Sequence, residues 1–145
     1  YRFLRPLAER GYPRAQVRVA RMLHSARGTK RDEDEALRFF ALALSPVQLA
    51  ASEGKAWAQS DLGDYFVDGY VIDSDYKNAA YWYRRAADQG YAPAQTNLGW
   101  LYMNGHGVNP DREVAIRWFK RAAKQGNSAA LDNLRVLGEP QPDSG

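Results

Sequence analysis

Few side chains in this sequence have the types and spacing that catalysis or metal binding requires. There is no cysteine, and the two histidines, His24 and His106, stand far apart with no further ligands grouped around them. Zinc sites need three or four ligands at short, regular spacings, so metal binding is not expected. The segment Gly105-His106-Gly107 lacks the lysine and the Ser/Thr that complete a phosphate-binding loop. We therefore expect no metal, no cofactor, no small-molecule substrate and no enzymatic activity.

The carboxylates at recurring positions are best explained as helix caps. Asp32, Asp75 and Asp111 each directly precede a predicted helix. A carboxylate at that position accepts the free backbone N–H groups of the first turn and interacts favourably with the helix dipole. Glu35, three residues after Asp32, predicts a variant of the reciprocal capping box. We therefore predict structural rather than catalytic roles for these side chains.

The helices that these aspartates begin belong to a repeat of 36 residues. The endings AASEG, AADQG and AAKQG occupy residues 50–54, 86–90 and 122–126, each 36 residues after the one before it. Small, apolar and aromatic residues keep the same interval: Ala58/Ala94/Ala130, Leu62/Leu98/Leu134, Gly63/Gly99, Trp82/Trp118 and Tyr83/Phe119. An earlier copy aligns at an interval of 43, which pairs Ala15 with Ala58, so it carries seven additional residues. Such a period is typical of solenoids of stacked helical hairpins.

Each copy predicts two helices, named helix A and helix B. Helix A has apolar residues at helical spacing, a glycine-containing loop follows, and helix B ends at Gly54, Gly90 or Gly126. We assign the residues as follows: 1–11 to the end of a preceding helix B, 12–54 to the first repeat, 55–90 to the second, 91–126 to the third, 127–138 to helix A of a terminal half repeat, and 139–145 to a flexible tail or linker. Residues 1–138 are thus expected to form one all-α solenoid. Because the sequence begins within a repeat, we expect a fragment of a longer solenoid.

The seven additional residues of the first repeat lie between about residues 43 and 50. Ser45-Pro46 in this segment has the form of an N-cap followed by a first-turn proline. We expect a broken or restarted helix here rather than a longer one. A structural irregularity and a partner-binding insertion are both open interpretations.

The repeat resembles the Sel-one-like repeat, a relative of the tetratricopeptide repeat. The resemblance rests on A-x-x-x-L-G-x-x-Y/F-x-x-G followed by D-x-x-x-A-x-x-W-Y/F-x-R-A-A-x-x-G, which the second and third copies match closely. The second copy departs at Tyr70 and Val71, where the family usually has another glycine, and the first has Val19-Ala20 in place of Leu-Gly. The resemblance implies a right-handed superhelix of antiparallel helix pairs that acts as a scaffold or adaptor. Some bacterial relatives are exported or act at the cell envelope, which favours that location by association, while the sequence itself leaves the compartment open.

The recurring aromatic residues are predicted to build the core rather than a site. Trp82 and Trp118 stand at fixed repeat positions beside small alanines, as in a stacked helical core. Gly63 and Gly99, which lie inside predicted helices at a cost of roughly 1 kcal/mol each, are predicted to allow close packing against a neighbouring helix. Function is therefore expected where the repeats differ.

The family resemblance places a partner-binding surface on the concave face, along helix A. The candidate partner-binding residues on or beside this face are Arg14, Arg18, Arg21, Trp57, Ser60, Asp64, Thr96, Asn97 and Trp100. The two tryptophans break the repeat pattern and are candidate interface anchors, although each could instead cover a neighbouring helix. The arginines could form a basic end suited to a carboxylate or an acidic peptide, or simply a solvated face. The predicted function is a scaffold that binds another protein or peptide.

The charge distribution leaves two alternatives to this function. Residues 1–40 hold ten Lys/Arg against five Asp/Glu, and residues 41–90 hold four against seven. A basic end could attract nucleic acid, but the aromatic platforms expected for single strands are not evident. A homo-oligomeric structural element, formed through repeat ends or the insertion, is the other alternative.

Overall fold

The computed structural model describes residues 3–25 and 30–142. Those residues form eight helices: α1 (Leu4–Glu9), α2 (Pro13–Ser25), α3 (Lys30–Ser52), α4 (Ala56–Asp68), α5 (Tyr76–Asp88), α6 (Ala92–Asn104), α7 (Arg112–Lys124) and α8 (Ser128–Val136). Contacts between helices run in chain order, each helix packing on the next. The expectation of an all-α solenoid is therefore confirmed.

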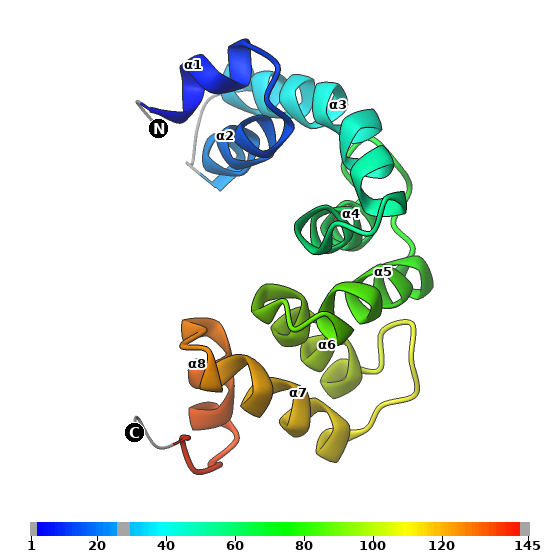
Figure 1. Ribbon diagram of the computed structural model, residues 1–145, viewed down its shortest axis with the longest axis vertical. Helices are drawn as coiled ribbons and strands as arrows, with labels where there is room; N and C mark the ends of the chain where they lie inside the picture. Colours follow the sequence, from blue (N-terminus) through cyan, green and yellow to red (C-terminus); the bar gives the residue numbers. More distant parts are fainter. Residues whose placement is uncertain (1–2, 26–29, 143–145) are drawn as a thin grey trace.

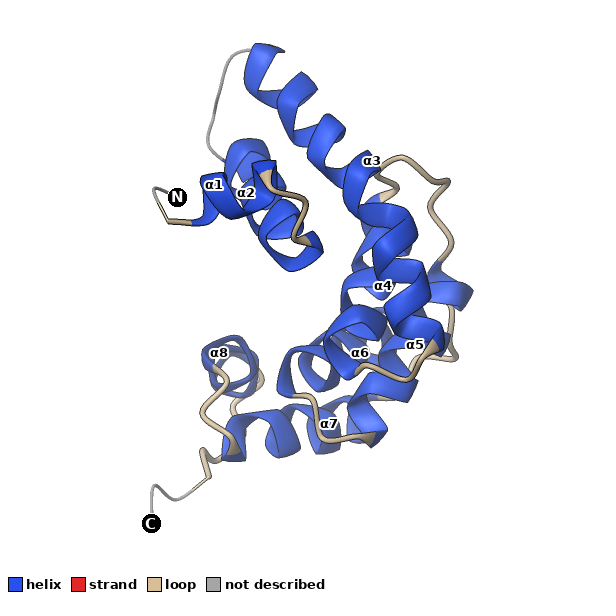
Figure 2. Ribbon diagram, turned by 45° about the horizontal axis from the view of Figure 1, so that its top comes forward, coloured by secondary structure: helices blue, strands red, loops and turns tan. Residues whose placement is uncertain are grey.

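The helices stack into an arc with an inner and an outer row. Helices α2, α4, α6 and α8 line the inner side of the arc, and α3, α5 and α7 lie on its outer side (Figure 1). The second view shows the same curved succession (Figure 2). Helix A of each repeat, as defined from the sequence, therefore lies on the concave side, and helix B lies on the outer side.

Buried small and aromatic residues hold each helix pair together. Tyr83 and Phe119, on α5 and α7, are almost fully buried, and Trp118 is buried beside them. A Cβ atom added at Gly63 would lie 2.5 Å from Cε1 of Tyr83, and one at Gly99 would lie 2.7 Å from Cε1 of Phe119. The predicted close approach is therefore confirmed, and its purpose is to admit the aromatic ring of the same repeat.

The caps of helix B differ between the repeats. Asp75 and Asp111 are the N-caps of α5 and α7, and their carboxylates accept from the backbone N–H of Asn78 at 3.2 Å and of Val114 at 3.1 Å. The prediction for Asp32 was wrong, because α3 begins at Lys30 and Asp32 lies within its first turn. The proposed reciprocal capping box with Glu35 is wrong for the same reason.

The prediction of a broken helix at the insertion was also wrong. α3 is a single helix of 23 residues with Pro46 inside it, and it bends along its length in both views (Figures 1 and 2). Proline removes one backbone hydrogen bond at a cost of roughly 3 kcal/mol in a helix interior. Ala43, Val47 and Ala51 lie on one face on both sides of the proline, and all three are fully buried. Burial of this continuous stripe outweighs the lost bond, so the insertion lengthens the helix.

The loops between helix A and helix B show where the second copy departs from the third. Gly69 and Gly105 end α4 and α6 in the left-handed conformation. Val71, which stands where the third copy has Gly107, has a φ of 66°. Ile72 N donates to Tyr70 O at 2.6 Å across it, which makes a strained γ-turn around a β-branched residue.

Buried glutamines fasten each helix A to the end of the preceding helix B. Gln16, Gln59 and Gln95 stand at equivalent repeat positions and are nearly inaccessible to solvent. Each Nε2 donates over 3.2 Å to a backbone oxygen, and the acceptors are Ala8, Ala51 and Ala87 respectively. Because buried polar groups need partners, this bond fixes the spacing of successive repeats.

The acceptor oxygens of these glutamines are not equally satisfied. Two of them accept from a further glutamine at the end of helix B: Gln89 donates to Gln59 at 2.8 Å and Gln125 donates to Gln95 at 3.1 Å. Oε1 of Gln16 is buried without a hydrogen-bond partner among the described residues. The equivalent position at the end of α3 is Glu53, whose carboxylate has no hydrogen to donate.

Candidate partner-binding surface

A polar hollow of about 200 Å³ opens on the concave side between α2, α4 and the start of α6. The residues that line it are Arg14, Val17, Arg18, Arg21, Ser60, Asp61, Asp64, Tyr91 and Pro93. Helical spacing explains the grouping, since residues three and four apart share one face of a helix. Five of the nine candidate binding residues thus meet at one place.

A carboxylate network forms one wall of this hollow. Arg21 Nη2 lies 3.1 Å from Asp61 Oδ1 and also forms an ion pair with Asp64. Asp64 accepts two further hydrogen bonds, from the hydroxyl of Tyr83 and from Asn97 Nδ2 at 3.3 Å. The network therefore links α2, α4, α5 and α6, which belong to three successive repeats.

Burial controls the ionisation of this network. Burial raises the pKa of Asp64 to about 6, although Arg21 and the Tyr83 hydroxyl act in the opposite direction. Burial likewise raises the pKa of Asp61, against the opposing effect of Arg21. Arg21 is engaged by both carboxylates, so its charge serves the structure and it is not free to act as a basic contact for a partner.

Arg14 and Arg18 remain as the available cations of the hollow. Both are exposed, and neither has a carboxylate within 4.0 Å among the residues that the structure describes. The guanidinium of Arg14 lies 5.0 Å from the ring centre of Trp57, a cation–π contact that holds it at the rim. The basic end predicted from three arginines therefore consists of two.

The two candidate tryptophans lie in different surroundings. Trp57 is half-buried against the first core cluster and lines a separate, apolar hollow beside Pro46 and Leu49. Trp100 is 39% exposed on α6, with ring centres 5.2 Å from His106 and 6.5 Å from Tyr76. Trp57 partly covers a neighbouring helix, and Trp100 presents more of its surface.

Two of the candidates expose very little of their surface. Ser60 and Thr96 are buried, with 3% and 5% of their surface exposed. Thr96 Oγ1 donates to Asn127 Oδ1 at 2.9 Å, and that oxygen also caps α8 by accepting from Ala130 N. Thr96 therefore supports the cap of α8, while Ser60 lines the hollow with little exposed surface. Asn97 is half-buried and is occupied by Asp64.

Sequence analysis did not include Asp61, Tyr83 or Tyr91 among the binding candidates. Asp61 lies three residues before Asp64 and opposite Arg21, so a search for facing opposite charges on adjacent helices could have found it. Tyr83 was assigned to the core, which is correct for its ring, while its hydroxyl reaches the carboxylate network. No sequence signal distinguishes Tyr91.

The histidines have packing roles in the structure. The ring of His106 stacks on Tyr76 at 4.5 Å, and that of His24 meets Tyr70 edge-on at 5.0 Å. The described residues contain no group of three or more His, Asp or Glu side chains placed to hold a metal ion. Within residues 3–25 and 30–142, no helix is both long and apolar enough to cross a membrane.

Comparison with known proteins agrees with the fold and the repeat. The family model of the Sel1 repeat matches residues 13–45, 58–91 and 92–127. The chain belongs to the Sel1 repeat family. Proteins of this Sel1 repeat family are generally scaffolds for protein–protein interaction. No curated protein matches the chain in sequence.

Two solved structures are similar to this Sel1 repeat chain. A Sel1 repeat protein from Oxalobacter formigenes has 29% sequence identity and a TM-score of 0.61, over 93% of this chain and 47% of its own. A protective antigen of uropathogenic Escherichia coli strains, which displays an SLR fold, has 30% identity and a TM-score of 0.62, over 90% of this chain and 27% of its own. The chain thus spans less than half the length of either neighbour.

Proposed function

We propose that this Sel1 repeat unit is a non-enzymatic scaffold that binds a protein or peptide on its concave surface. The observation that carries the proposal is the hollow between α2, α4 and α6, where Arg14 and Arg18 stand at the rim without an ion pair among the described residues. Solenoids present extended curved surfaces of this kind with little capacity for a deep catalytic pocket.

The chemistry of the hollow favours a partner with a carboxylate. Arginine binds carboxylates through two parallel hydrogen bonds, and Arg14 is already oriented by its contact with Trp57. Asp61 and Asp64 are occupied by Arg21, so they oppose an incoming anion less than free carboxylates would. Tyr91 and Pro93 supply a less polar edge against which the partner's backbone can pack.

Affinity capture from a native lysate tests this proposal. The wild-type chain is compared with an Arg14→Glu/Arg18→Glu variant, and circular dichroism establishes that both are folded. A matched control, Lys77→Glu/Lys124→Glu, makes the same change of charge at exposed positions on the outer helices α5 and α7. We expect a protein that is retained by the wild type and the control and lost by the arginine variant. Equal retention by all three would refute the concave site.

Self-association is a second candidate function, favoured by one observation. An apolar hollow of about 400 Å³ lies beside the insertion, and Leu49 on its rim is 62% exposed. Light scattering over a range of protein concentrations tests this alternative. A mass that rises with concentration and is restored to the monomer value by Leu49→Glu would favour it.

A further inference from the structure

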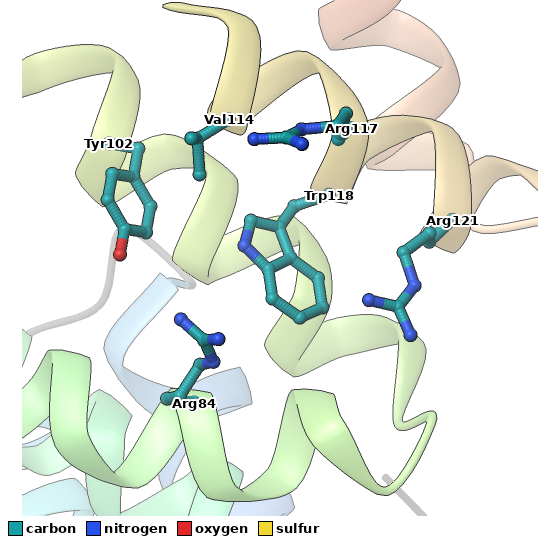
Figure 3. A pocket seen from close by; sticks show the side chains of 6 residues that line it. All are labelled: Arg84, Tyr102, Val114, Arg117, Trp118 and Arg121. Carbon is teal, nitrogen blue, oxygen red and sulfur yellow. The ribbon is translucent and has the colours of Figure 1, made fainter. Parts of the chain in front are cut away.

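A third hollow lies toward the outer helix row, where α5, α6 and α7 meet. Its volume is about 400 Å³, and the side chains that line it are Arg84, Tyr102, Val114, Arg117, Trp118 and Arg121. In the close view the indole of Trp118 lies in the centre, with the arginines around it and Tyr102 and Val114 on one side (Figure 3). The lining thus contains three cations and no carboxylate.

Two of the three guanidinium groups lie over the indole ring of Trp118, and the charges of the three are not cancelled by carboxylates within the hollow. That of Arg121 lies 4.6 Å from the centre of the Trp118 ring and that of Arg84 lies 5.5 Å from it. Neither Arg117 nor Arg121 has a carboxylate within 4.0 Å among the described residues. Arg84 bonds to Asp88 only through Nε, at 3.2 Å, so its two terminal nitrogens stay available.

The remaining polar groups of this hollow are also donors. Trp118 Nε1 can only donate, the Tyr102 hydroxyl can donate, and neither takes part in a hydrogen bond among the described residues. Arginine forks and neutral donors around one space are complementary to an oxyanion. The faces of Trp118 and Val114 form an apolar floor, so the ligand needs an apolar part beside its charge.

Comparison with the preceding repeat shows which arginines of the hollow recur with the repeat and which are particular to this site. Arg121 has an equivalent in Arg85, which lies 5.3 Å from the ring centre of Trp82, so this stacked pair recurs with the repeat. Arg84 and Arg117 have no equivalents in the preceding repeats, because the matching positions hold Ala41, at the interval of 43 that pairs Phe40 with Tyr83, and Tyr81, at the interval of 36. The three-arginine arrangement is therefore not required to build a Sel1 repeat.

We propose that the hollow formed by Arg84, Arg117 and Trp118 is a second docking site, which takes a peptide with Asp or Glu side chains next to an apolar residue. A nucleic acid would need a basic track that follows its backbone, whereas these arginines surround one confined hollow with an apolar floor. The site lies apart from the concave surface, and a chain with both sites would join two partners.

Fluorescence anisotropy with a short labelled peptide of alternating glutamate and leucine tests the site. We expect saturable binding that weakens as salt is raised, because exposed charge pairs are screened. A peptide with glutamine in place of glutamate should bind at least about tenfold more weakly. Equal binding of the two peptides would overturn the proposal, and so would binding of inorganic phosphate or a phosphoserine peptide in the absence of binding to the glutamate peptide.

Matched variants locate the binding. Arg84→Gln/Arg117→Gln should weaken binding of the glutamate peptide at least about tenfold. In contrast, Arg85→Gln removes the arginine that stacks on Trp82 in the preceding repeat, and it should leave the affinity unchanged. Thermal unfolding shows whether each variant keeps its fold. Because Arg14 and Arg18 lie on α2 and do not line this hollow, Arg14→Glu/Arg18→Glu should retain the peptide, so the two sites are tested independently. Loss with the concave variant and retention with Arg84→Gln/Arg117→Gln would refute the second site.

Discussion

The two regular repeats, α4 to α7, and the irregular first pair, α2 and α3, pack helix A against an aromatic ring of helix B with different residues. In the regular repeats a glycine at position 63 or 99 lets an aromatic ring approach the backbone of helix A. In the first pair Ala20 and Phe40 occupy the equivalent positions, and both are buried. The ring and helix A must therefore be spaced differently there, and α3 is lengthened by the insertion.

This difference teaches that the repeat motif specifies contacts rather than individual residues. The buried glutamine that fastens helix A to the preceding unit is present in all three repeats. Its second partner is present only in the regular ones, and in the first pair the matching position of the sequence is Glu53. The irregular region keeps the fold while leaving some of its polar groups less well satisfied.

The largest expected effect comes from adding a side-chain atom at the glycine where helix A approaches the aromatic ring of helix B in a regular repeat. Gly63→Ala places a Cβ atom 2.5 Å from the ring of Tyr83, which is buried and bonded to Asp64. Overpacking should lower the free energy of unfolding by about 2 kcal/mol, despite the better helix propensity of alanine. Denaturant titration measures the change. Ala20→Gly is the counterpart in the first pair; it lowers helix propensity and removes a buried methyl group, so it should also cost about 2 kcal/mol. A Gly63→Ala variant as stable as the wild type would contradict the close approach in the regular repeat.

The next effect concerns the carboxylate network, which joins the irregular pair to the regular repeats. The pKa of Asp64 is raised in the folded state to about 6 from an ordinary 3.8, so the folded protein binds this proton more tightly than the unfolded chain. Its contribution to stability is therefore complete below pH 4 and is lost as the pH rises through about 6. After allowance for solvent screening, the loss should amount to roughly 1–2 kcal/mol.

Asp64→Asn isolates that contribution. Asparagine keeps an oxygen that can accept from the Tyr83 hydroxyl, and it does not titrate. The difference in unfolding free energy between wild type and variant, measured by urea titration at several pH values, should shift in favour of the variant between pH 4 and 7. Groups that face Asp64 and also respond to pH are Asp61, Asp68 and Tyr83, with Arg21 as the cation, and they are common to both proteins. A difference that is flat with pH would contradict the raised pKa.

A smaller effect distinguishes the helix caps. Asp111→Ala removes an acceptor from the N–H of Val114 and should cost about 1 kcal/mol. Asp32→Ala should cost only a few tenths of a kcal/mol, since Asp32 lies inside the first turn of α3 and contributes mainly through the helix dipole. Thermal unfolding of both variants checks this ranking. A larger loss at Asp32 would restore the cap that the sequence predicted.

A structural feature could be predicted from the sequence when the residues that produce it recur at the repeat interval. The repeat interval predicted the core positions, the glycines at close approach and the caps at Asp75 and Asp111. It failed at Pro46, because the local signal there competes with a buried stripe of Ala43, Val47 and Ala51 that only packing reveals. At Asp32 it failed because α3 begins two residues earlier, at Lys30. In the candidate site, Arg14 and Arg18 lie where they were expected. The engagement of Arg21 by Asp61 is a contact between helices that the pattern of one helix does not contain.

The smallest predicted effect comes from a substitution that makes the irregular pair more like the regular repeats. Glu53→Gln places an amide at the position in the repeat that Gln89 and Gln125 occupy in the other repeats, and we predict that its Nε2 donates to the buried Oε1 of Gln16. Satisfying a buried acceptor should raise the free energy of unfolding by about 0.5–1 kcal/mol. Gln89→Glu is the converse change, because it removes the donor to Gln59 in a regular repeat and should lower stability by at least as much. Denaturant titration of the two variants measures both signs. Stabilisation by the first and destabilisation by the second would establish the glutamine pair as a transferable element of the repeat, whereas destabilisation by Glu53→Gln would mean that the bend of α3 holds its end out of reach of Gln16.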